Sequence, residues 1–273
     1  MKHMILAIAF LAFLPAGGAV AGSEFDNGMR AYRAKNYSEA AKWFREGADK
    51  ADAASRVWLG VLYSHGRGLA KDTAKGLALT RQAADQNYTP ALYSMGRHHL
   101  QGQPPQRDIQ KASGFLTQAA TQGHREAQHV LGLLYRAGAG VEKSYENAVM
   151  WFEKAALQRH PEAQNAMGDA YYFRLGVDRD YEKALGWYLK AGTNGNSSAQ
   201  NSLGVIFAKG LGVTANHRVS LVWFEKAARL GHATAQGNVA ELYARGKRGI
   251  PRDFEKAFLW NAVAVLTDKK KAA

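Results

Sequence analysis

Small and apolar residues recur along this chain at intervals of 36 residues, with polar segments between them. Five glycines mark the interval and Ala240 takes the next position: Gly60, Gly96, Gly132, Gly168 and Gly204. The stretch from 125 to 158 shows one complete period, with an apolar face at helical spacing in each half. A fixed period of this length is typical of a solenoid, in which each unit packs only on its neighbours.

Each period predicts two helices joined by a turn. The first helices are expected near 53–65, 89–101, 125–137, 161–173, 197–209 and 233–245. The second helices are expected near 73–86, 109–122, 145–158, 181–193, 217–230 and 254–266. A shorter hairpin over 22–52 is predicted to cap the N-terminal end, and residues 267–273 are predicted to form a frayed basic tail.

A residue that favours the N-cap position precedes every predicted second helix. These residues are Asn36, Asp72, Asp108, Ser144, Asp180, Asn216 and Asp253, the last displaced by one extra residue in the preceding loop. Their side chains accept hydrogen bonds from the unpaired N–H groups of the first helical turn. The sequence therefore places the start of each second helix at a defined residue.

Paired glycines follow several of the first helices, as in Gly66–Gly68, Gly138–Gly140 and Gly210–Gly212. Glycine adopts the positive φ that ends a helix, so we interpret these pairs as structural turns. A phosphate-binding loop is the alternative, but no strand precedes the glycines. Two loops are expected to differ in shape, because Gln103-Pro104-Pro105 follows Gly102 in one and Arg174 replaces the first glycine in another.

A large, mostly aromatic residue recurs once per period in the second helix. The series is Trp43, Leu79, Phe115, Trp151, Trp187, Trp223 and Trp260. Such rings could bind sugars or quaternary amines, but one large ring per repeat is also what a stacked core requires. We predict that these side chains form the core.

The motif of one period resembles a known family. Ala163-Gln-Asn-Ala-Met-Gly168-Asp-Ala-Tyr171, followed by Asp180-Tyr-Glu-Lys-Ala184-Leu-Gly-Trp187, is similar to the Sel1-like repeat, a relative of the tetratricopeptide repeat. The resemblance covers nearly all of the chain after residue 21. It implies an all-α, right-handed solenoid of helix-turn-helix repeats, six of them over 53–266, and functions that mostly concern protein–protein assembly, signalling and envelope processes.

Some secreted, cysteine-rich relatives are linked to β-lactam binding and hydrolysis. Those relatives carry a disulfide in each repeat, whereas this chain has no cysteine. The resemblance therefore does not extend that activity to this chain. The same absence excludes disulfides, metal–thiolate sites and cysteine catalysis.

The N-terminus resembles a secretory signal peptide. Lys2 supplies the positive end, an apolar run follows from Met4 to Leu14, and Ala19-Val20-Ala21 provides small residues for cleavage. A membrane anchor is the alternative, but Pro15 and two glycines interrupt a run that would need about 20 apolar residues. We expect cleavage after Ala21, a periplasmic or secreted protein, and no transmembrane segment in the mature chain.

The chain is strongly basic, with a formal net charge of +13. This charge favours acidic groups on a partner, or an anionic polysaccharide or cell-wall polymer. Nucleic acid is not expected as a partner, because an exported protein rarely meets it. The charge could also serve only solubility.

One face of each first helix is left free by the packing pattern. It comprises the second, fifth, ninth and twelfth residues, which in a right-handed helical solenoid would line a concave groove. We predict partner binding by eleven residues of this face and its rims: Tyr93, Arg97, His129, Arg136, Asn165, Asp169, Tyr172, Asn201, Lys209, Glu241 and Arg245. Asn165 and Asn201 suit an extended backbone, and the cations suit carboxylates.

No catalytic constellation or metal motif stands out, and no cofactor is expected. His124, His160 and His232 occupy the same position at the start of successive first helices, which indicates a structural role. His99 fills a position that is tyrosine in other repeats, which predicts a packed aromatic ring. Glu162 and Asp169 could share a cavity, but nothing in the sequence polarises them. The sequence thus predicts an exported, non-enzymatic scaffold that binds a protein or peptide segment, with polysaccharide binding or a cell-wall or β-lactam hydrolase as the alternatives.

Overall fold

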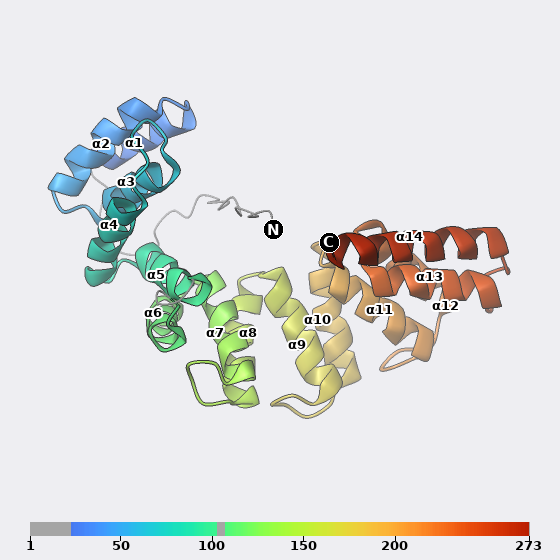
Figure 1. Cartoon of the computed structure of the whole chain (residues 1–273). Coiled ribbons are helices and arrows are strands. Elements are labelled where there is room, and N and C mark those ends of the chain that lie inside the picture. The colour runs from blue at the N-terminus through green and yellow to red at the C-terminus, as the bar shows by residue number, and fades with distance from the viewer. Residues whose placement is uncertain (1–22, 103–106, 273) are drawn as a thin grey trace. The chain divides into compact units, whose positions relative to one another are not determined.

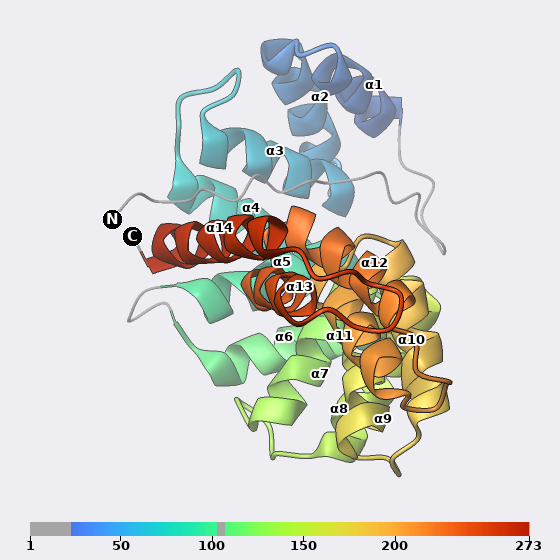
Figure 2. The ribbon, with the colours of Figure 1, turned by 90° about the vertical axis from the view of Figure 1, so that its right-hand side faces the viewer.

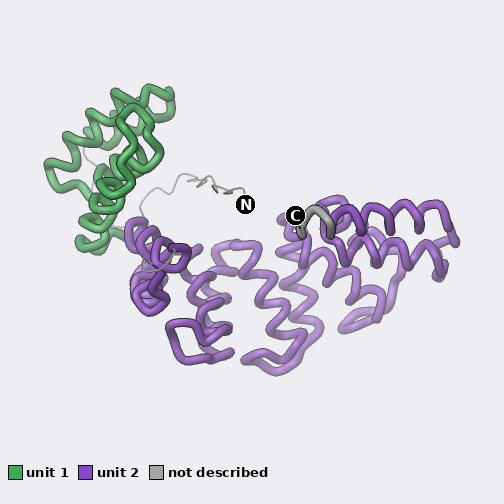
Figure 3. Tube along the Cα trace, viewed as in Figure 1, with its two compact units in different colours: residues 1–88 green, residues 89–273 purple. Residues whose placement is uncertain are grey.

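The computed structural model describes residues 23–102 and 107–272. These residues form fourteen helices, and the only β-type pairing among them is an isolated bridge between Lys247 and Ile250. The all-α fold predicted from the sequence is confirmed. The helices belong to two compact units, residues 1–88 and 89–273 (Figure 3). The predicted signal peptide and residues 103–106 lie outside the described residues.

Unit 1 contains two helix hairpins. Its helices are α1 (Ser23–Arg33), α2 (Tyr37–Asp49), α3 (Ala53–His65) and α4 (Thr73–Asp85). The core of this unit is centred on Phe44 and Leu62, both fully buried. Each helix contacts the next along the chain, so unit 1 is a short solenoid.

Unit 2 contains five hairpins. Its helices are α5 (Thr89–Gln101), α6 (Ile109–Thr121), α7 (Arg125–Ala137), α8 (Tyr145–Leu157), α9 (Pro161–Phe173), α10 (Tyr181–Thr193), α11 (Ser197–Lys209), α12 (His217–Arg229), α13 (Ala233–Arg245) and α14 (Phe254–Ala272). Within this unit each helix from α5 to α13 contacts the helix that follows it (Figures 1 and 2). Within unit 2 the predicted stack of helix hairpins is therefore continuous.

The predicted helix starts are confirmed at every second helix. The seven predicted N-cap side chains each accept a hydrogen bond from the backbone N–H three residues later, as Asp180 does from Lys183 at 2.9 Å. First helices are capped in the same way by Asp52, His124, His160, Asn196 and His232. The histidine series is therefore structural, as predicted.

Two predictions about chain ends and loops were wrong. Helix α14 continues to Ala272, so residues 267–272 belong to this helix and not to a separate tail. Arg174 ends α9 in the left-handed conformation, with a φ of 60°, close to the 64° of Gly66. The loop after α9 therefore begins like its glycine counterparts, at the cost of a side chain in a region that glycine tolerates better.

The predicted core series was displaced by one residue. Of the large side chains assigned to it, only Trp151 is buried, and the others are half-buried. The buried ring is usually the next residue: Phe44, Phe152, Tyr188 and Phe224, with Leu116 in α6. These side chains lie against the glycine of the first helix, where a Cβ at Gly168 would come within 2.5 Å of the Tyr188 ring. The glycine series and the buried ring thus fit together, and the tryptophans lie beside them.

A lysine covers three of these tryptophan rings. The ammonium groups of Lys154, Lys190 and Lys226 lie 4.3, 4.1 and 4.2 Å from the ring centroids of Trp151, Trp187 and Trp223. Each lysine stands three residues after its tryptophan, on the same face of the helix. The tryptophan position therefore forms the boundary between core and solvent on the even-numbered helices.

Buried glutamines join successive hairpins of unit 2. Gln128, Gln164, Gln200 and Gln236 each donate a hydrogen bond of 2.9–3.1 Å to the carbonyl eight residues earlier, near the end of the preceding helix. Each of these carbonyls also accepts from the backbone N–H three residues later, so the glutamine supplies a second hydrogen bond at the helix end. We call these side-chain bonds the glutamine latches. The equivalent positions in α5 and α3 hold Leu92 and Arg56, so the latches occur only within unit 2.

None of the helices in the described part of the chain has the length and apolar character needed to cross a membrane.

Candidate partner-binding face

The eleven predicted partner-binding residues all belong to unit 2, on the odd-numbered helices α5 to α13. We call the surface formed by the second, fifth, ninth and twelfth residues of these helices, together with the terminal Lys209 and Arg245, the odd-helix face. N-caps at the same helical position give α7, α9, α11 and α13 the same side-chain register. The chemistry of the face therefore depends on which residue each repeat places there.

Exposure divides the predicted residues into two groups. Arg136, Lys209, Glu241 and Arg245 are exposed. The other seven are half-buried: Tyr93, Arg97, His129, Asn165, Asp169, Tyr172 and Asn201. The middle of the face is therefore partly covered by its own side chains.

Stacked rings join neighbouring repeats on this face. Tyr93 stacks on His124, with ring centroids 4.4 Å apart, and His129 packs on His160 at 4.5 Å. Burial, with smaller effects of the neighbouring His160 and Arg136, lowers the pKa of His129 to about 4. His129 is therefore neutral at pH 7. Burial likewise raises the pKa of Tyr93.

The capping histidines have a defined tautomer. The Nδ1 atom of His124 accepts from the backbone N–H of Ala127 at 3.2 Å, so this atom carries no proton. When His124 is neutral, its 3.4 Å contact with Glu126 is therefore not an ion pair. Burial lowers the pKa of His124, which favours this neutral form. His160 repeats the arrangement with Ala163 and Glu162.

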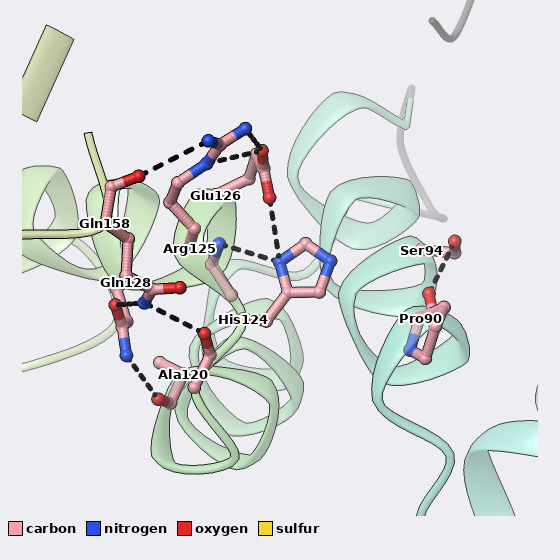
Figure 4. Close-up of polar contacts among 10 residues, drawn as sticks. Pro90, Ser94, Ala120, His124, Arg125, Glu126, Gln128 and Gln158 are labelled. Carbon is pink, nitrogen blue, oxygen red and sulfur yellow. Dashed lines mark hydrogen bonds and ion pairs between the residues drawn. The ribbon is translucent and has the colours of Figure 1, made fainter. Parts of the chain in front are cut away.

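Polar contacts around His124 extend to the neighbouring repeat (Figure 4). Burial disfavours the charged form of Glu126, but hydrogen bonds from Arg125, the shorter of them 2.8 Å, hold the pKa of Glu126 below its usual value. Gln158 donates to Gln128 at 2.8 Å and to the carbonyl of Gly123 at 3.0 Å. These contacts occupy the groups that a ligand would otherwise meet at this point.

The predicted residues come together at one place, around Asp169. The Asp169 carboxylate accepts a hydrogen bond of 2.7 Å from the Tyr188 hydroxyl and one of 3.1 Å from Asn165. Burial raises the pKa of Asp169, while Tyr188, Arg136 and Asn165 act in the opposite direction. Arg136 and Asp169 line a small pocket between α7, α8 and α9, together with Phe152. We call Arg136, Asn165, Asp169, Tyr172 and Tyr188 the Asp169 cluster.

One polar atom of this cluster has no partner in the structure. The side-chain oxygen Oδ1 of Asn165 is buried and accepts no hydrogen bond, while its amide nitrogen donates to Asp169. A buried acceptor of this kind costs free energy until a donor reaches it. The guanidinium of Arg136 lies 5.8 Å from the Phe152 ring centroid and is exposed beside it. The Asp169 cluster therefore combines one buried, unpaired acceptor with one exposed cation.

The remaining predicted residues lie apart from this cluster. Arg97 lies over the Tyr93 ring at 5.8 Å and contacts Gln101 at 3.3 Å. Asn201 accepts from Asn238 at 3.0 Å, so its oxygen is engaged within the protein and not free for a peptide. Glu241 and Arg245 form an ion pair of 3.2 Å one helical turn apart. Lys209 is exposed at the end of α11.

Sequence reasoning missed Tyr188, which completes the Asp169 cluster from α10. The adjacent Trp187 drew attention because it recurs at the repeat interval, whereas Tyr188 is the residue that faces the glycine of α9. The signal was present in the pairs Trp151-Phe152, Trp187-Tyr188 and Trp223-Phe224. Among the described residues, no three histidine, aspartate or glutamate side chains are placed to hold a metal ion.

Comparison with known proteins gives a repeated match. The family description "Sel1 repeat" matches seven consecutive segments, 22–52, 53–88, 89–124, 125–160, 161–196, 197–232 and 233–260. Residues 22–52, expected as a capping hairpin, are thus matched as a repeat. No curated protein matches the chain.

Two solved structures are similar over most of the chain. One is a protective antigen present in uropathogenic Escherichia coli strains that displays an SLR fold, with 30% sequence identity and a TM-score of 0.83. The similarity covers 89% of this chain but 53% of that protein, so this chain spans about half its length. The other is a Sel1 repeat protein from Oxalobacter formigenes, with 26% identity, a TM-score of 0.79, and coverage of 89% and 97%.

Proposed function

Because this chain belongs to the Sel1 repeat family, whose repeats form scaffolds for protein–protein interaction, we propose that it binds a protein or peptide segment on the odd-helix face of unit 2. Solenoids commonly bind ligands along an extended repeat surface. We propose no catalytic role for the chain.

The Asp169 cluster is the centre of the proposed contact. The observation that carries this assignment is that the exposed Arg136 shares a small pocket with Asp169, whose carboxylate is bound by Asn165, a residue with an unpartnered Oδ1. A carbonyl or carboxylate of an extended segment would accept from Arg136, and a backbone N–H of the same segment would satisfy the asparagine oxygen once the Asn165 side chain turns out of its buried position. We therefore propose a segment that presents an acidic or carbonyl group close to a free N–H.

Site-specific crosslinking tests this proposal. A photoreactive amino acid at position 172, in the Asp169 cluster, should capture a discrete protein from an envelope extract. The same amino acid at position 157, an exposed leucine on α8, should not capture it. Capture from both positions alike, or from neither, would rule out this face.

Affinity for the captured protein then tests the residues themselves. Arg136→Ser and Asn165→Ala should each weaken binding by about tenfold, because each removes one hydrogen-bonding group. Arg159→Ser, an exposed arginine outside the cluster, is the matched control and should bind normally. The helical melting curve should be retained, which separates loss of contact from loss of fold.

We also propose that the mature protein starts at Gly22 and acts outside the cytoplasm, in envelope signalling or assembly. Lys2, the apolar run from Met4 to Leu14 and Ala19-Val20-Ala21 support this proposal. N-terminal sequencing of the protein recovered from cells tests it. A retained Met1 would contradict it.

A second candidate ligand is an acidic polysaccharide or cell-wall polymer, supported by the net charge of +13. Such binding should be lost at moderate salt, because exposed charges are screened. It should also survive Arg136→Ser and Asn165→Ala, which distinguishes it from peptide binding in the Asp169 cluster.

A further inference from the structure

The last helix departs from the repeat pattern on its outer side. Six large apolar residues of α14 are exposed, with exposed fractions from 41% to 72%: Phe254, Phe258, Leu259, Val263, Val265 and Leu266. The position that holds Lys154, Lys190 and Lys226 in three earlier helices holds Val263 here, three residues after Trp260. The lysine that separates core from solvent elsewhere is thus replaced by an apolar side chain.

These residues cover about half of the helix circumference. At about 100° per residue, they lie on the side opposite Ala257, Trp260 and Ala264, the more buried residues of this helix. Between Ala257 and Thr267 the helix is apolar on nearly all sides, with Asn261 as the exception. A helix of this kind requires cover on both sides.

Exposed cations border this apolar surface. Lys247, Arg248 and Arg252 are exposed in the loop that leads into α14, and the Arg252 guanidinium lies 5.7 Å from the Phe254 ring centroid. The loop is held in place by buried Ile250 and by a 2.8 Å hydrogen bond from Arg218 to the carbonyl of Gly249. Asp253 is paired with Lys256 at 3.0 Å, which leaves Glu255 as the exposed acid at the start of the helix.

We propose that this surface, apolar α14 with its basic loop, docks on an anionic lipid surface. Helix α14 would lie in the plane of the headgroups, with Phe254, Phe258 and Leu266 toward the acyl chains and the loop cations on lipid phosphates. A second copy of the chain fits the charges less well. Two copies that meet through this surface would bring two strongly basic molecules together, whereas anionic lipid neutralises the cations as it covers the apolar side chains.

A fluorescent label on α14 tests the proposal directly. The chain has no cysteine, so Ala262→Cys places a polarity-sensitive label on the exposed side of α14, and Leu157→Cys places one on α8 as a control. With vesicles of phosphatidylglycerol and phosphatidylcholine, we expect a blue shift at position 262 and none at 157. Vesicles of phosphatidylcholine alone should produce little shift, and salt should weaken the response.

Matched substitutions test whether vesicle binding depends on the apolar surface of α14. Residues 1–21 are the same in all variants, so they cannot cause a difference between variants. Phe258→Ser with Leu266→Ser should weaken vesicle binding by about tenfold or more. Phe173→Ser with Leu157→Ser changes the same residue types at exposed positions elsewhere and should leave binding unchanged. Because all four side chains are exposed, each pair should retain the helical melting curve.

Two results would overturn the proposal. One is a label at position 262 that does not respond to anionic vesicles, or responds no more than the label at 157. The other is a blue shift at position 262 that occurs without lipid and grows with protein concentration. It would be accompanied by a dimer in analytical ultracentrifugation, and Phe258→Ser with Leu266→Ser would remove that dimer. That result would assign the surface to contact between two copies. Neither result affects the test of the Asp169 cluster.

Discussion

At the scale of single residues, the contact between Gly168 and Tyr188 links the core to the candidate site. Tyr188 packs against this glycine and donates its hydroxyl to Asp169, the next residue of α9. A side chain at 168 would displace the ring that holds the carboxylate. Core packing and the geometry of the Asp169 cluster therefore depend on the same tyrosine.

Gly168→Ala should accordingly destabilise the protein by about 1–3 kcal/mol, because the new methyl group overpacks the Tyr188 ring. Gly186→Ala is the control in α10, where a Cβ would meet no atom within 4 Å. It should stabilise the helix by roughly 0.5–1 kcal/mol, since alanine loses less backbone entropy than glycine. Urea unfolding of both variants gives the comparison, and equal effects would contradict the packing argument.

The half-buried His129 should make the free energy of unfolding depend on pH. Its pKa is 6.5 without perturbation and about 4 in the folded protein, so between these values protons bind mainly to the unfolded chain. The contribution of His129 to the free energy of unfolding is fully present above pH 6.5 and is lost as the pH falls toward 4. The loss should reach about 2–3 kcal/mol by pH 4.5.

Urea unfolding of wild type and His129→Phe at pH 7.5 and 4.5 checks this expectation. The phenylalanine keeps a ring against His160 but cannot bind a proton, so it should lose less stability on acidification. His65→Phe, at an exposed position, should behave as wild type does. Equal losses in wild type and His129→Phe would show that His129 is not the source.

At the scale of the helix hairpin, the glutamine latches differ in how their oxygens are satisfied. Gln128 Oε1 accepts from Gln158 at 2.8 Å, and Gln164 Oε1 is 3.5 Å from the amide of Asn194. Both partners cap the end of a second helix, thirty residues after the latch. Leu230 holds that position for Gln200, whose Oε1 is buried without a partner.

Leu230→Gln should therefore stabilise unit 2 by about 0.5–1.5 kcal/mol, because the new amide can donate to Gln200 as Gln158 does to Gln128. The substitution also removes a leucine that is 58% exposed. Leu157→Gln, at a leucine that is 69% exposed, serves as the control. Thermal melting distinguishes the two, and a gain shared by both variants would point to surface polarity and not to the latch.

Helix positions were predictable from the sequence because their causes are local. Asp180 and its counterparts start a helix through a bond to the N–H three residues later, so the repeat interval alone located most helices to within one residue. The orientation of the adjacent rings Trp187 and Tyr188 was not local. It depends on which ring faces Gly168 when two helices pack together. The repeat interval alone favours Trp187 as the core ring, whereas the structure places Tyr188 there.

The residues of the candidate site were predictable within one helix, but their contacts with other helices were not. Helical periodicity identified Arg136, Asn165 and Asp169 on one face, and the structure brings them together around one carboxylate. Periodicity within one helix could not supply Tyr188, which comes from the next helix, or the pairing of Asn201 with Asn238 of α13. Contacts between repeats decide which predicted groups stay free for a partner.

At the scale of the whole molecule, the cores of unit 2 are shared between neighbouring hairpins. Leu203 of α11 is fully buried and lies in one cluster with Tyr188 of α10, and a Cβ at Gly192 would come within 2.9 Å of its side chain. A repeat array of this kind transmits a core defect to its neighbours. Unit 2 should therefore respond beyond the hairpin that carries the substitution.

Leu203→Ala should destabilise unit 2 by about 2–5 kcal/mol, because it leaves a cavity between two hairpins. Amide hydrogen exchange should show faster opening in α9 and α10 as well as in α11 and α12. Leu157→Ala, at a leucine that is 69% exposed, should change neither stability nor exchange appreciably. Faster exchange confined to α11 and α12 would mean that the hairpins are energetically separate.

The glutamine latches also make the number of repeats adjustable. Each latch joins a glutamine amide to the backbone carbonyl eight residues earlier, so the latch bond before α9 matches the latch bond before α11. Loss or duplication of residues 161–196 as a block would therefore preserve a latch bond at the new junction. Such a change would lengthen or shorten the odd-helix face by one repeat. The length of this binding face is therefore set in whole steps of 36 residues.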